Sequence, residues 1–281
     1  TLGFENKTYD ESKYIKEIKG NIDKKIYYAD KDLIKSSFSE ISTLLNDPIG
    51  DGSIIPTYIL QKKIKEFTNV SLGGDGGDES FFGYITFDAF YLANILKKII
   101  PSFVLNILKI ISNKFKDSTN YITFKTKIKK FFNSINLDRK YLLPNWMGCL
   151  DEKNMQMLFN NEIKNNILHD DMESLFMKKR HFMRTAQLYH YKFYLPMILL
   201  KIDQASMFNS VESRSPFLSK KIINFTLDYD LAKLYGLFNK KKFLKKSFKQ
   251  IIPKNVLNRK KHGFAVPKDI ILKDKKFINQ F

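Results

Sequence analysis

The 281-residue sequence predicts an α/β fold in which a parallel sheet is followed by a large helical extension. Helical and β-rich segments alternate over residues 10–72, as they do in parallel βαβ units. A glycine-rich turn follows the apolar run at residues 69–72. Beyond Phe81 the pattern changes to long helices with apolar residues at helical spacing.

The first part of the chain supplies the expected sheet. Apolar residues at helical spacing predict a helix over 10–22, and turn chemistry at 47–52 separates two later helices. We expect Val70 to Leu72 to form an interior parallel strand, with the loop from Gly73 to Asp78 at its carboxyl end. The expected order is strand end 1–4, helix 10–22, strand 25–29, helix 32–45, helix 54–67 and strand 69–72.

The second part of the chain is expected to be helical, with prolines that interrupt its helices. Helices are predicted up to Ile110 and over 122–132, 176–200 and 220–234. We therefore divide the chain into residues 1–90, the carboxyl-terminal part of a nucleotide-binding sheet, and residues 91–281, the helical remainder.

Composition narrows the class of protein. A hydrophobic content of 43% can supply a substantial core, so a disordered chain is excluded. No stretch is long and apolar enough to span a bilayer and no secretory signal is visible, so we expect a cytoplasmic protein without a membrane partner. Cys149 is the single cysteine and agrees with a reducing compartment. The net charge of +19 raises nucleic-acid binding as a hypothesis, but the lysines are spread along the chain, which argues against a nucleic acid as partner.

The richest segment for chemistry is the run Leu72-Gly73-Gly74-Asp75-Gly76-Gly77-Asp78-Glu79-Ser80. Glycines let a backbone turn sharply and direct N–H groups at one point, so such a loop can hold a phosphate. The run also carries the carboxylates of Asp75, Asp78 and Glu79, which are compatible with a bound phosphate if Mg²⁺ or a substrate ammonium group is bound as well. Asp78 and Glu79 are the candidate metal ligands. A structural turn without a ligand is the alternative. A calcium-binding repeat is disfavoured because only one copy is present.

Other polar residues carry weaker signals. His169, His181, His190 and His262 are dispersed without metal-ligand spacing, so we interpret them as surface or packing residues. Glu212 and Arg214 are two positions apart and are expected to make structural ion pairs.

Four blocks of sequence resemble the asparagine synthetase family, in that family's order across nearly the whole chain. The blocks are residues 47–84, with Asp47-Pro48-Ile49-Gly50-Asp51, Ser53-Ile54-Ile55-Pro56-Thr57-Tyr58, the glycine-rich run and Gly83-Tyr84; residues 201–207, with Lys201-Ile202-Asp203-Gln204-Ala205-Ser206-Met207; residues 210–218, with Ser210-Val211-Glu212-Ser213-Arg214-Ser215-Pro216-Phe217-Leu218; and residues 241–267, with Lys241-Lys242-Phe243-Leu244-Lys245, Ile252-Pro253, Arg259-Lys260-Lys261-His262-Gly263-Phe264 and Pro267.

The resemblance implies a Rossmann-like fold of the adenine nucleotide alpha-hydrolase (ATP pyrophosphatase) type. It implies a ligase, asparagine synthase (glutamine-hydrolysing), that adenylates the side-chain carboxylate of aspartate with ATP and Mg²⁺. Ammonia from a separate glutaminase domain then displaces AMP to give asparagine. A homodimer is implied for the full-length protein.

Roles follow from the matching positions. Gly73 and Gly74 match the pair that contacts ATP, and Leu2 matches a backbone contact to adenine. Asp75 matches the acid that takes a proton from ammonia, and Asp78 a residue near the amino group of aspartate. Lys241 matches a lysine that holds phosphate.

Departures from the family pattern set further expectations. No Ser-Gly-Gly-x-Asp-Ser loop and no amino-terminal cysteine nucleophile occur in these residues, so we expect a truncated form that is inactive alone. Gly73 stands where a serine is usual, and Ser219 where an aspartate is common. These changes leave the substrate open. The alternatives are an amidotransferase acting on another carboxylate, such as a sugar acid of a surface polysaccharide, and a basic nucleic-acid-binding protein.

Overall fold

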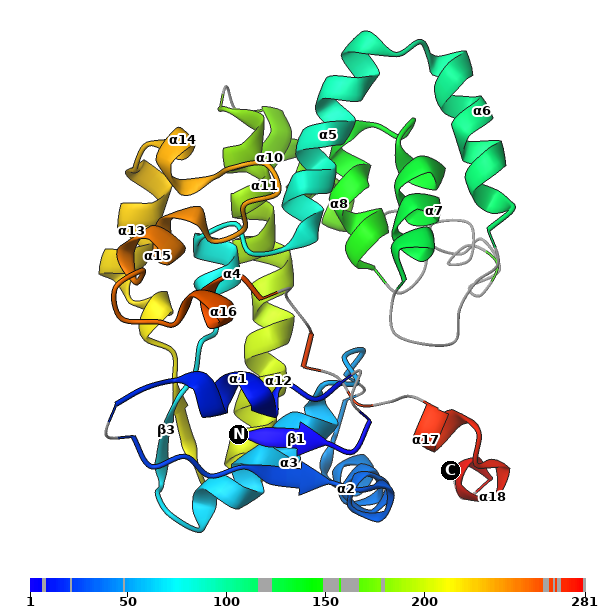
Figure 1. The fold of residues 1–281 in the computed structure, drawn as a ribbon. Helices are drawn as coiled ribbons and strands as arrows, with labels where there is room; N and C mark the ends of the chain where they lie inside the picture. The colour runs from blue at the N-terminus through cyan, green and yellow to red at the C-terminus, as the bar shows by residue number, and fades with distance from the viewer. Residues whose placement is uncertain are drawn as a thin grey trace.

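The computed structural model describes residues 1–6, 9–20, 22–47, 49–115, 123–148, 157, 167–177, 180–259, 263–264, 266 and 269–279 (Figure 1). Its first part contains β1 (Leu2–Phe4), α1 (Ser12–Glu17), β2 (Tyr27–Ala29), α2 (Lys31–Leu44), α3 (Ile54–Lys65), β3 (Val70–Leu72) and α4 (Gly77–Ser80). The helices that follow are α5 (Ile85–Ile99), α6 (Ser102–Asn113), α7 (Phe124–Ser134), α8 (Arg139–Met147), α10 (Ile167–Met177), α11 (Phe182–Tyr189), the π-helix η1 (His190–Tyr194) and α12 (Leu195–Met207). The chain continues through β4 (Glu212–Arg214), the 3-10 helix η2 (Pro216–Leu218), α13 (Lys220–Asp228), α14 (Leu231–Leu234), α15 (Lys242–Ser247), α16 (Lys254–Leu257), α17 (Asp269–Leu272) and α18 (Lys275–Ile278).

The strands form two separate parallel pairs. Strand β1 pairs with β2, and β3 pairs with β4 in the register Val70 to Glu212 and Leu72 to Arg214. The α/β class and the parallel pairing of residues 70–72 are confirmed. The expectation of an interior strand is wrong, because Val70 is 39% exposed and Leu72 is 76% exposed. An apolar run in a two-stranded pair has no second layer on both faces, so its side chains meet water.

One hydrophobic cluster holds the strand-rich part together. Leu2 and Phe4 of β1 are buried against α2 and α3, where Ile34 and Ile59 are among the most buried side chains. Ala205 of α12 joins the same cluster, so this long helix is tied to the β1–β2 pair.

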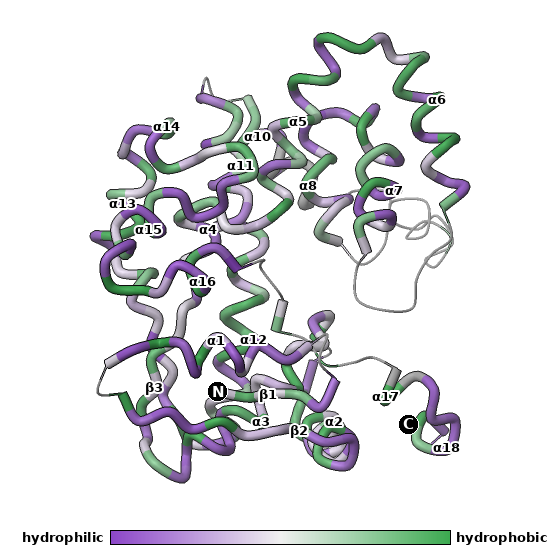
Figure 2. Tube along the Cα trace, in the orientation of Figure 1, coloured by the Kyte–Doolittle hydropathy of each residue, from purple (hydrophilic) through white to green (hydrophobic). Residues whose placement is uncertain are grey.

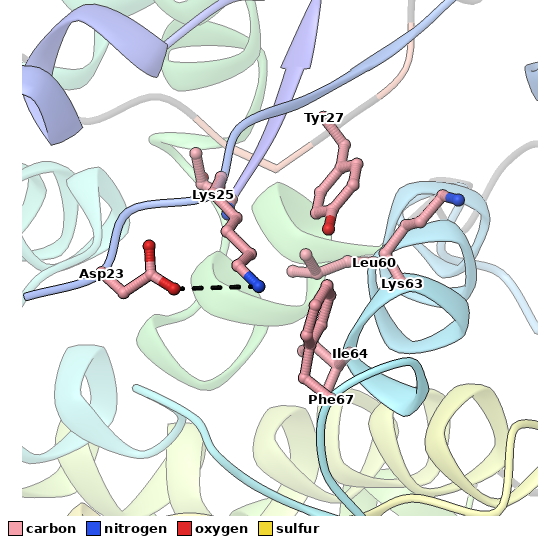
Figure 3. A pocket seen from close by; sticks show the side chains of 8 residues that line it. Asp23, Lys25, Tyr27, Leu60, Lys63, Ile64 and Phe67 are labelled. Carbon is pink, nitrogen blue, oxygen red and sulfur yellow. Dashed lines mark hydrogen bonds and ion pairs between the residues drawn. The ribbon is translucent and has the colours of Figure 1, made fainter.

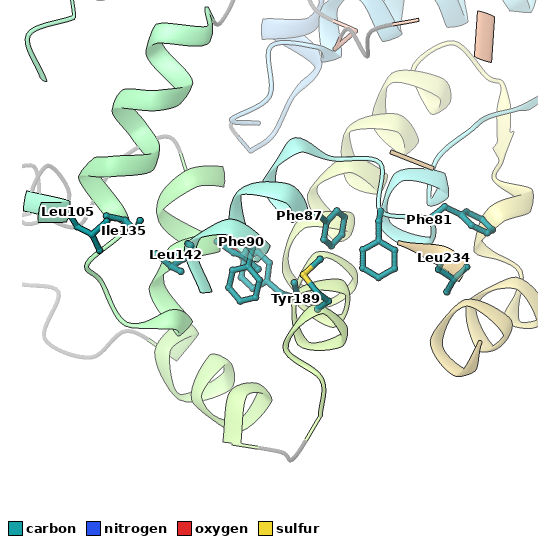
Figure 4. Close-up of a cluster of buried hydrophobic side chains, with 13 residues drawn as sticks. Phe81, Phe87, Phe90, Leu105, Ile135, Leu142, Tyr189 and Leu234 are labelled. Atoms are coloured by element: carbon teal, nitrogen blue, oxygen red, sulfur yellow. The ribbon is translucent and has the colours of Figure 1, made fainter. Parts of the chain in front are cut away.

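A second hydrophobic cluster forms the helical part. Phe87 and Phe90 of α5 are fully buried, and Figure 4 shows Phe90 beside Leu142 of α8 and near Tyr189 of α11. The hydropathy trace in Figure 2 shows apolar residues of α5, α8 and α11 where these helices meet. These large aromatic side chains bury extensive apolar surface and stabilise this region together with the aliphatic residues around them.

Several expected helices are shorter or divided. The helix predicted over 10–22 ends at Glu17, because the backbone of the next residue, Ile18, is extended, so α1 covers six residues. The helix expected up to Ile110 is split into α5 and α6 at Pro101, because the residue before a proline is driven out of the helical region. The helix expected over 176–200 is divided among α10, α11, η1 and α12. The last three of these form one rod from the helical cluster to the β-strands (Figure 1).

Candidate functional site

The glycine-rich loop lies at the carboxyl end of β3, as the sequence predicts. The Gly73 N–H donates to the Arg214 carbonyl at 2.7 Å and thereby extends the β3–β4 ladder by one residue. Gly76 has φ +81°, a conformation that glycine adopts without strain. A side chain at Gly76 would collide with Leu218 of η2. The segment after β4 therefore covers the loop closely enough to require this glycine.

Asp75 is folded back over the start of this loop. A Cβ atom added at Gly73 would meet Asp75 Oδ2 at 2.6 Å, so the usual serine at position 73 does not fit beside this carboxylate without a shift. Burial raises the pKa of Asp75 above its ordinary value, while Lys201 and the Ser215 hydroxyl act in the opposite direction. The carboxylate is thus a stronger proton acceptor than a solvated one.

A buried lysine from α12 faces the same region. Lys201 is 9% exposed, and its Nζ donates to Asp51 Oδ2 at 3.0 Å and to Ser53 Oγ at 2.8 Å. Burial acts to raise the pKa of Asp51, but the Lys201 ammonium and Ser53 outweigh it and hold this pKa below its ordinary value. Sequence reasoning assigned no role to Lys201 or Asp51. The sequence signal that could have identified Lys201 and Asp51 is that each lies inside one of the four blocks that resemble the family.

Asp78 and Lys241 are brought together from distant parts of the chain. Lys241 Nζ lies 3.1 Å from Asp78 Oδ1, and both side chains are partly exposed. A Cβ atom at Gly83 would collide with Asp78 and would lie 2.7 Å from Lys241 Cε. The ion pair therefore occupies the space that a side chain at position 83 would need. Lys241 has φ +53°, which holds it in the left-handed conformation just before α15.

Glu79 is directed into the protein rather than toward the loop. It is 1% exposed and accepts a hydrogen bond from Tyr84 Oη at 2.6 Å. Burial and the charge of Glu79 raise the pKa of Tyr84, and burial together with Asp51 raises the pKa of Tyr194 to about 12. In the described part of the chain no three His, Cys, Asp or Glu residues are placed to hold a metal ion. The candidate metal ligands Asp78 and Glu79 thus have a lysine and a tyrosine as neighbours.

The remaining predicted residues lie elsewhere. Leu2 is in the β1–β2 pair, with its side chain buried. His190 is buried, with Nδ1 2.7 Å from the Ala186 carbonyl and the ring stacked on Phe87, which confirms a packing role. Glu212 pairs directly with Arg214 at 2.8 Å on the surface. Pro48, Cys149, His262 and Pro267 lie outside the described residues, as does the side chain of His169.

A pocket of 370 Å³ lies at the amino ends of β1 and β2 (Figure 3). Lys25 Nζ lies 3.4 Å from the centre of the Phe67 ring and 3.7 Å from Asp23 Oδ2. Parallel strands bind ligands at their carboxyl ends, and none of the candidate site residues lines this pocket. The glycine-rich loop is therefore the better candidate site.

Fold and site together define an α/β protein with an acidic, glycine-rich loop at the carboxyl end of parallel strands and lysines facing that loop. The chain belongs to the asparagine synthase family, whose model matches residues 1–277. It is 27% identical over 230 residues to asparagine synthetase (glutamine-hydrolyzing) 1 of Bacillus subtilis strain 168, covering 79% of this chain and 34% of that protein.

Two further relatives carry related names. Identity is 35% over 107 residues to the protein named putative asparagine synthetase (glutamine-hydrolyzing) 2 of Methanocaldococcus jannaschii, covering 37% of this chain and 20% of that protein. Identity is 22% over 236 residues to the putative asparagine synthetase (glutamine-hydrolyzing) of Mycobacterium bovis, covering 83% of this chain and 35% of that protein. The chain spans about a third of the length of the relatives that match most of it. No solved structure matches. No helix in the described ranges has the length and apolar character needed to cross a membrane.

Proposed function

We propose that this chain carries the synthetase chemistry of an ATP-dependent amide-forming ligase that converts aspartate and ammonia to asparagine. The observation that carries the proposal is the meeting of Asp75, Asp78 and Lys241 around the β3 loop, although Lys241 lies far from the other two in the sequence. Membership of the asparagine synthase family supports the same chemistry. A Rossmann-like nucleotide domain remains our interpretation of the strand-rich part.

Gly74 is the place where the loop can approach ATP most closely. A Cβ atom at Gly74 would meet nothing within 4 Å, so a ligand can reach the backbone there. The Gly73 N–H already donates to Arg214, so that donor is committed to the strand ladder. We assign the Gly74 backbone and the Lys241 ammonium to ATP, and we keep Leu2 as the adenine contact.

Lys241 and Asp78 suit two ligands of opposite charge. Lys241 is 35% exposed in its side chain and can turn from Asp78 toward the β- and γ-phosphates. Asp78 would then accept the ammonium group of aspartate in place of the lysine. The pair thus keeps each charge compensated before binding and exchanges its partners when both substrates arrive.

In the first step, an oxygen of the aspartate side-chain carboxylate attacks the α-phosphorus of ATP, and pyrophosphate leaves. Lys241 stabilises the charge that builds up on the leaving group. Mg²⁺ bound to the phosphates would neutralise part of the same charge. Of the two carboxylates that the sequence suggested for the ion, Glu79 is buried against Tyr84 and directed away from the loop, and Asp78 is assigned to the ammonium group of aspartate. The described residues therefore offer no cluster of carboxylates to hold Mg²⁺ at the loop, and the ion would be held mainly by the phosphates.

In the second step, ammonia attacks the activated carbonyl carbon and AMP leaves. The attacking nitrogen must lose a proton, and Asp75 is the proposed acceptor because burial raises its pKa. A base with a raised pKa accepts a proton from the developing ammonium more readily than an ordinary carboxylate. A glutaminase domain is the proposed source of ammonia, and a homodimer the proposed assembly.

The test measures AMP, pyrophosphate and asparagine from Mg·ATP, aspartate and ammonium chloride. It is made on the 281-residue chain and on any longer protein that carries it. Ammonium chloride removes the need for a glutaminase domain. Formation of all three products supports the proposal. AMP release only with a uronic acid would move the activity to a sugar carboxylate. Failure of the longer protein to form AMP with either substrate would refute amide synthesis, whereas inactivity of the 281-residue chain alone is the expected result.

A further inference from the structure

Helix α6 carries apolar side chains on two opposite faces. Leu105 on its inner face is buried in the helical cluster. The outer face exposes four large side chains, which we name the α6 stripe: Phe103, Ile107, Ile110 and Ile111, each between 49% and 64% exposed. Their spacing places them along one side of the helix. The apolar side chains of α6 thus extend beyond the face that packs on the helical cluster, and no described residue covers the α6 stripe.

Two further exposed apolar side chains lie at the ends of the neighbouring helices that precede and follow α6 in the chain. Ile99, at the end of α5, is 72% exposed, and Phe124, at the start of α7, is 76% exposed. Figure 1 places α6 at the outer edge of the molecule, away from β3 and α4, and Figure 2 shows its apolar character there. The surface is thus separate from the candidate active site.

The charge around the α6 stripe identifies its partner by complementarity. Nine lysines and one acidic residue, Asp117, lie between positions 97 and 134. Lys98, Lys114, Lys125 and Lys130 are exposed. A second copy of the chain would bring two such basic faces together, and like charges at an interface oppose association. The surface therefore suits a partner that is both anionic and able to take up aliphatic side chains.

We propose, in place of the expectation from composition that no membrane is a partner, that the α6 stripe docks on an anionic lipid surface, with α6 lying in the plane of the interface. Apolar side chains on one face of a helix insert between lipid head groups, while lysines beside them extend to the phosphates. A nucleic acid would complement the charge of this surface but not its apolar side chains. Bases stack on aromatic rings, whereas three of the four side chains of the α6 stripe are isoleucine.

Vesicle flotation tests this proposal. The 281-residue chain, and any longer protein that carries it, is mixed with vesicles of phosphatidylcholine alone or with about one third phosphatidylglycerol. Both proteins should float with the anionic vesicles and not with the neutral ones.

Two matched substitutions distinguish binding through the α6 stripe from nonspecific hydrophobic binding. Ile110→Ser should lower partitioning about tenfold, because inserting one isoleucine is worth about that much. Ile251→Ser removes an isoleucine that is even more exposed but lies after α15, and it should leave partitioning unchanged. Ile107→Ser provides a second variant on the stripe, and circular dichroism should show the same melting temperature for all three variants.

Several results would overturn the proposal. One is equal flotation with neutral and anionic vesicles, and another is an equal loss of vesicle binding for Ile110→Ser and Ile251→Ser. A third is flotation of the 281-residue chain but not of a longer protein, which would mean that the rest of that protein covers the α6 stripe. A lipid-free dimer abolished by Ile110→Ser would identify the face as a self-interface. Displacement from vesicles by random DNA or RNA, with DNA or RNA binding unaffected by Ile110→Ser, would identify a nucleic-acid surface.

Discussion

Replacing Lys241 by alanine should remove most of the pyrophosphate-forming activity that we propose while leaving the fold intact. The Lys241 ammonium lies 3.1 Å from Asp78 Oδ1, and the lysine backbone is held at φ +53° before α15. The backbone and the pairing with Asp78 keep this charge beside the loop, so a rotation of the side chain away from Asp78 is enough to bring the ammonium group to a phosphate.

The expected magnitude follows from the exposure of the pair. A preorganised charge contact to a leaving group is worth about 100- to 1000-fold in rate. The ion pair itself is partly exposed on both sides, so its loss should cost about 0 to 1 kcal/mol of folding stability. Lys241→Gly sharpens the test, since glycine adopts the left-handed backbone without strain. It should be as inactive as Lys241→Ala and at least as stable.

The assay is pyrophosphate release from Mg·ATP and aspartate by a longer protein that carries this chain, combined with thermal melting. Lys242 is the matched control, because its Nζ donates to the Ala232 carbonyl at 2.7 Å and Lys242→Ala should stay within about threefold of the parent. Lys240 is a poorer control, since burial lowers its pKa and Asp88 is its neighbour. Indistinguishable rates for Lys241→Ala and Lys242→Ala would refute the role of Lys241.

Three further predictions concern the surroundings of the loop. Asp75→Asn should slow amide formation about 100- to 10,000-fold while AMP formation continues, and equal loss of both would contradict its role as a base. The same variant should be more stable than the parent at neutral pH. Folding raises the pKa of the Asp75 carboxyl, so the parent loses stability as the pH rises through that pKa. Melting curves at several pH values should therefore show that the extra stability of Asp75→Asn disappears as the pH falls toward about 4. Gly83→Ala should cost about 1 to 3 kcal/mol because its Cβ collides with Asp78, whereas Gly74→Ala should be nearly neutral, and equal melting temperatures would contradict the geometry. Lys201→Met should cost about 2 to 3 kcal/mol by leaving Asp51 charged and poorly solvated, and adding Asp51→Asn should restore part of it. The stabilisation by Asp51 is present above its ordinary pKa of about 4 and is lost as the pH falls through its lowered pKa, so the cost of Lys201→Met should shrink in acid.

Local sequence patterns predicted several elements well. The helices expected over 32–45 and 54–67 appear as α2 and α3, and the strand over 25–29 appears as β2, shortened to three residues. Periodic apolar spacing and turn residues are local signals, so they reach these elements without knowledge of the fold. Strand β4 was not predicted, because its Glu-Ser-Arg sequence has no apolar pattern and its partner β3 lies far away in the sequence.

The sequence by itself determined the family-like blocks, the glycine-rich loop after β3 and the residues that could carry chemistry. Only the tertiary structure decided which of these residues meet. Lys241 reaches Asp78, Lys201 reaches Asp51, and Glu79 is buried with Tyr84. The Lys241 contact depends on how the segment before α15 packs against the loop, and the Lys201 contact depends on how α12 packs against the turn before α3. Packing between segments far apart in the chain leaves no periodic signal in either segment, and for that reason the sequence identified the candidate residues but not their partners.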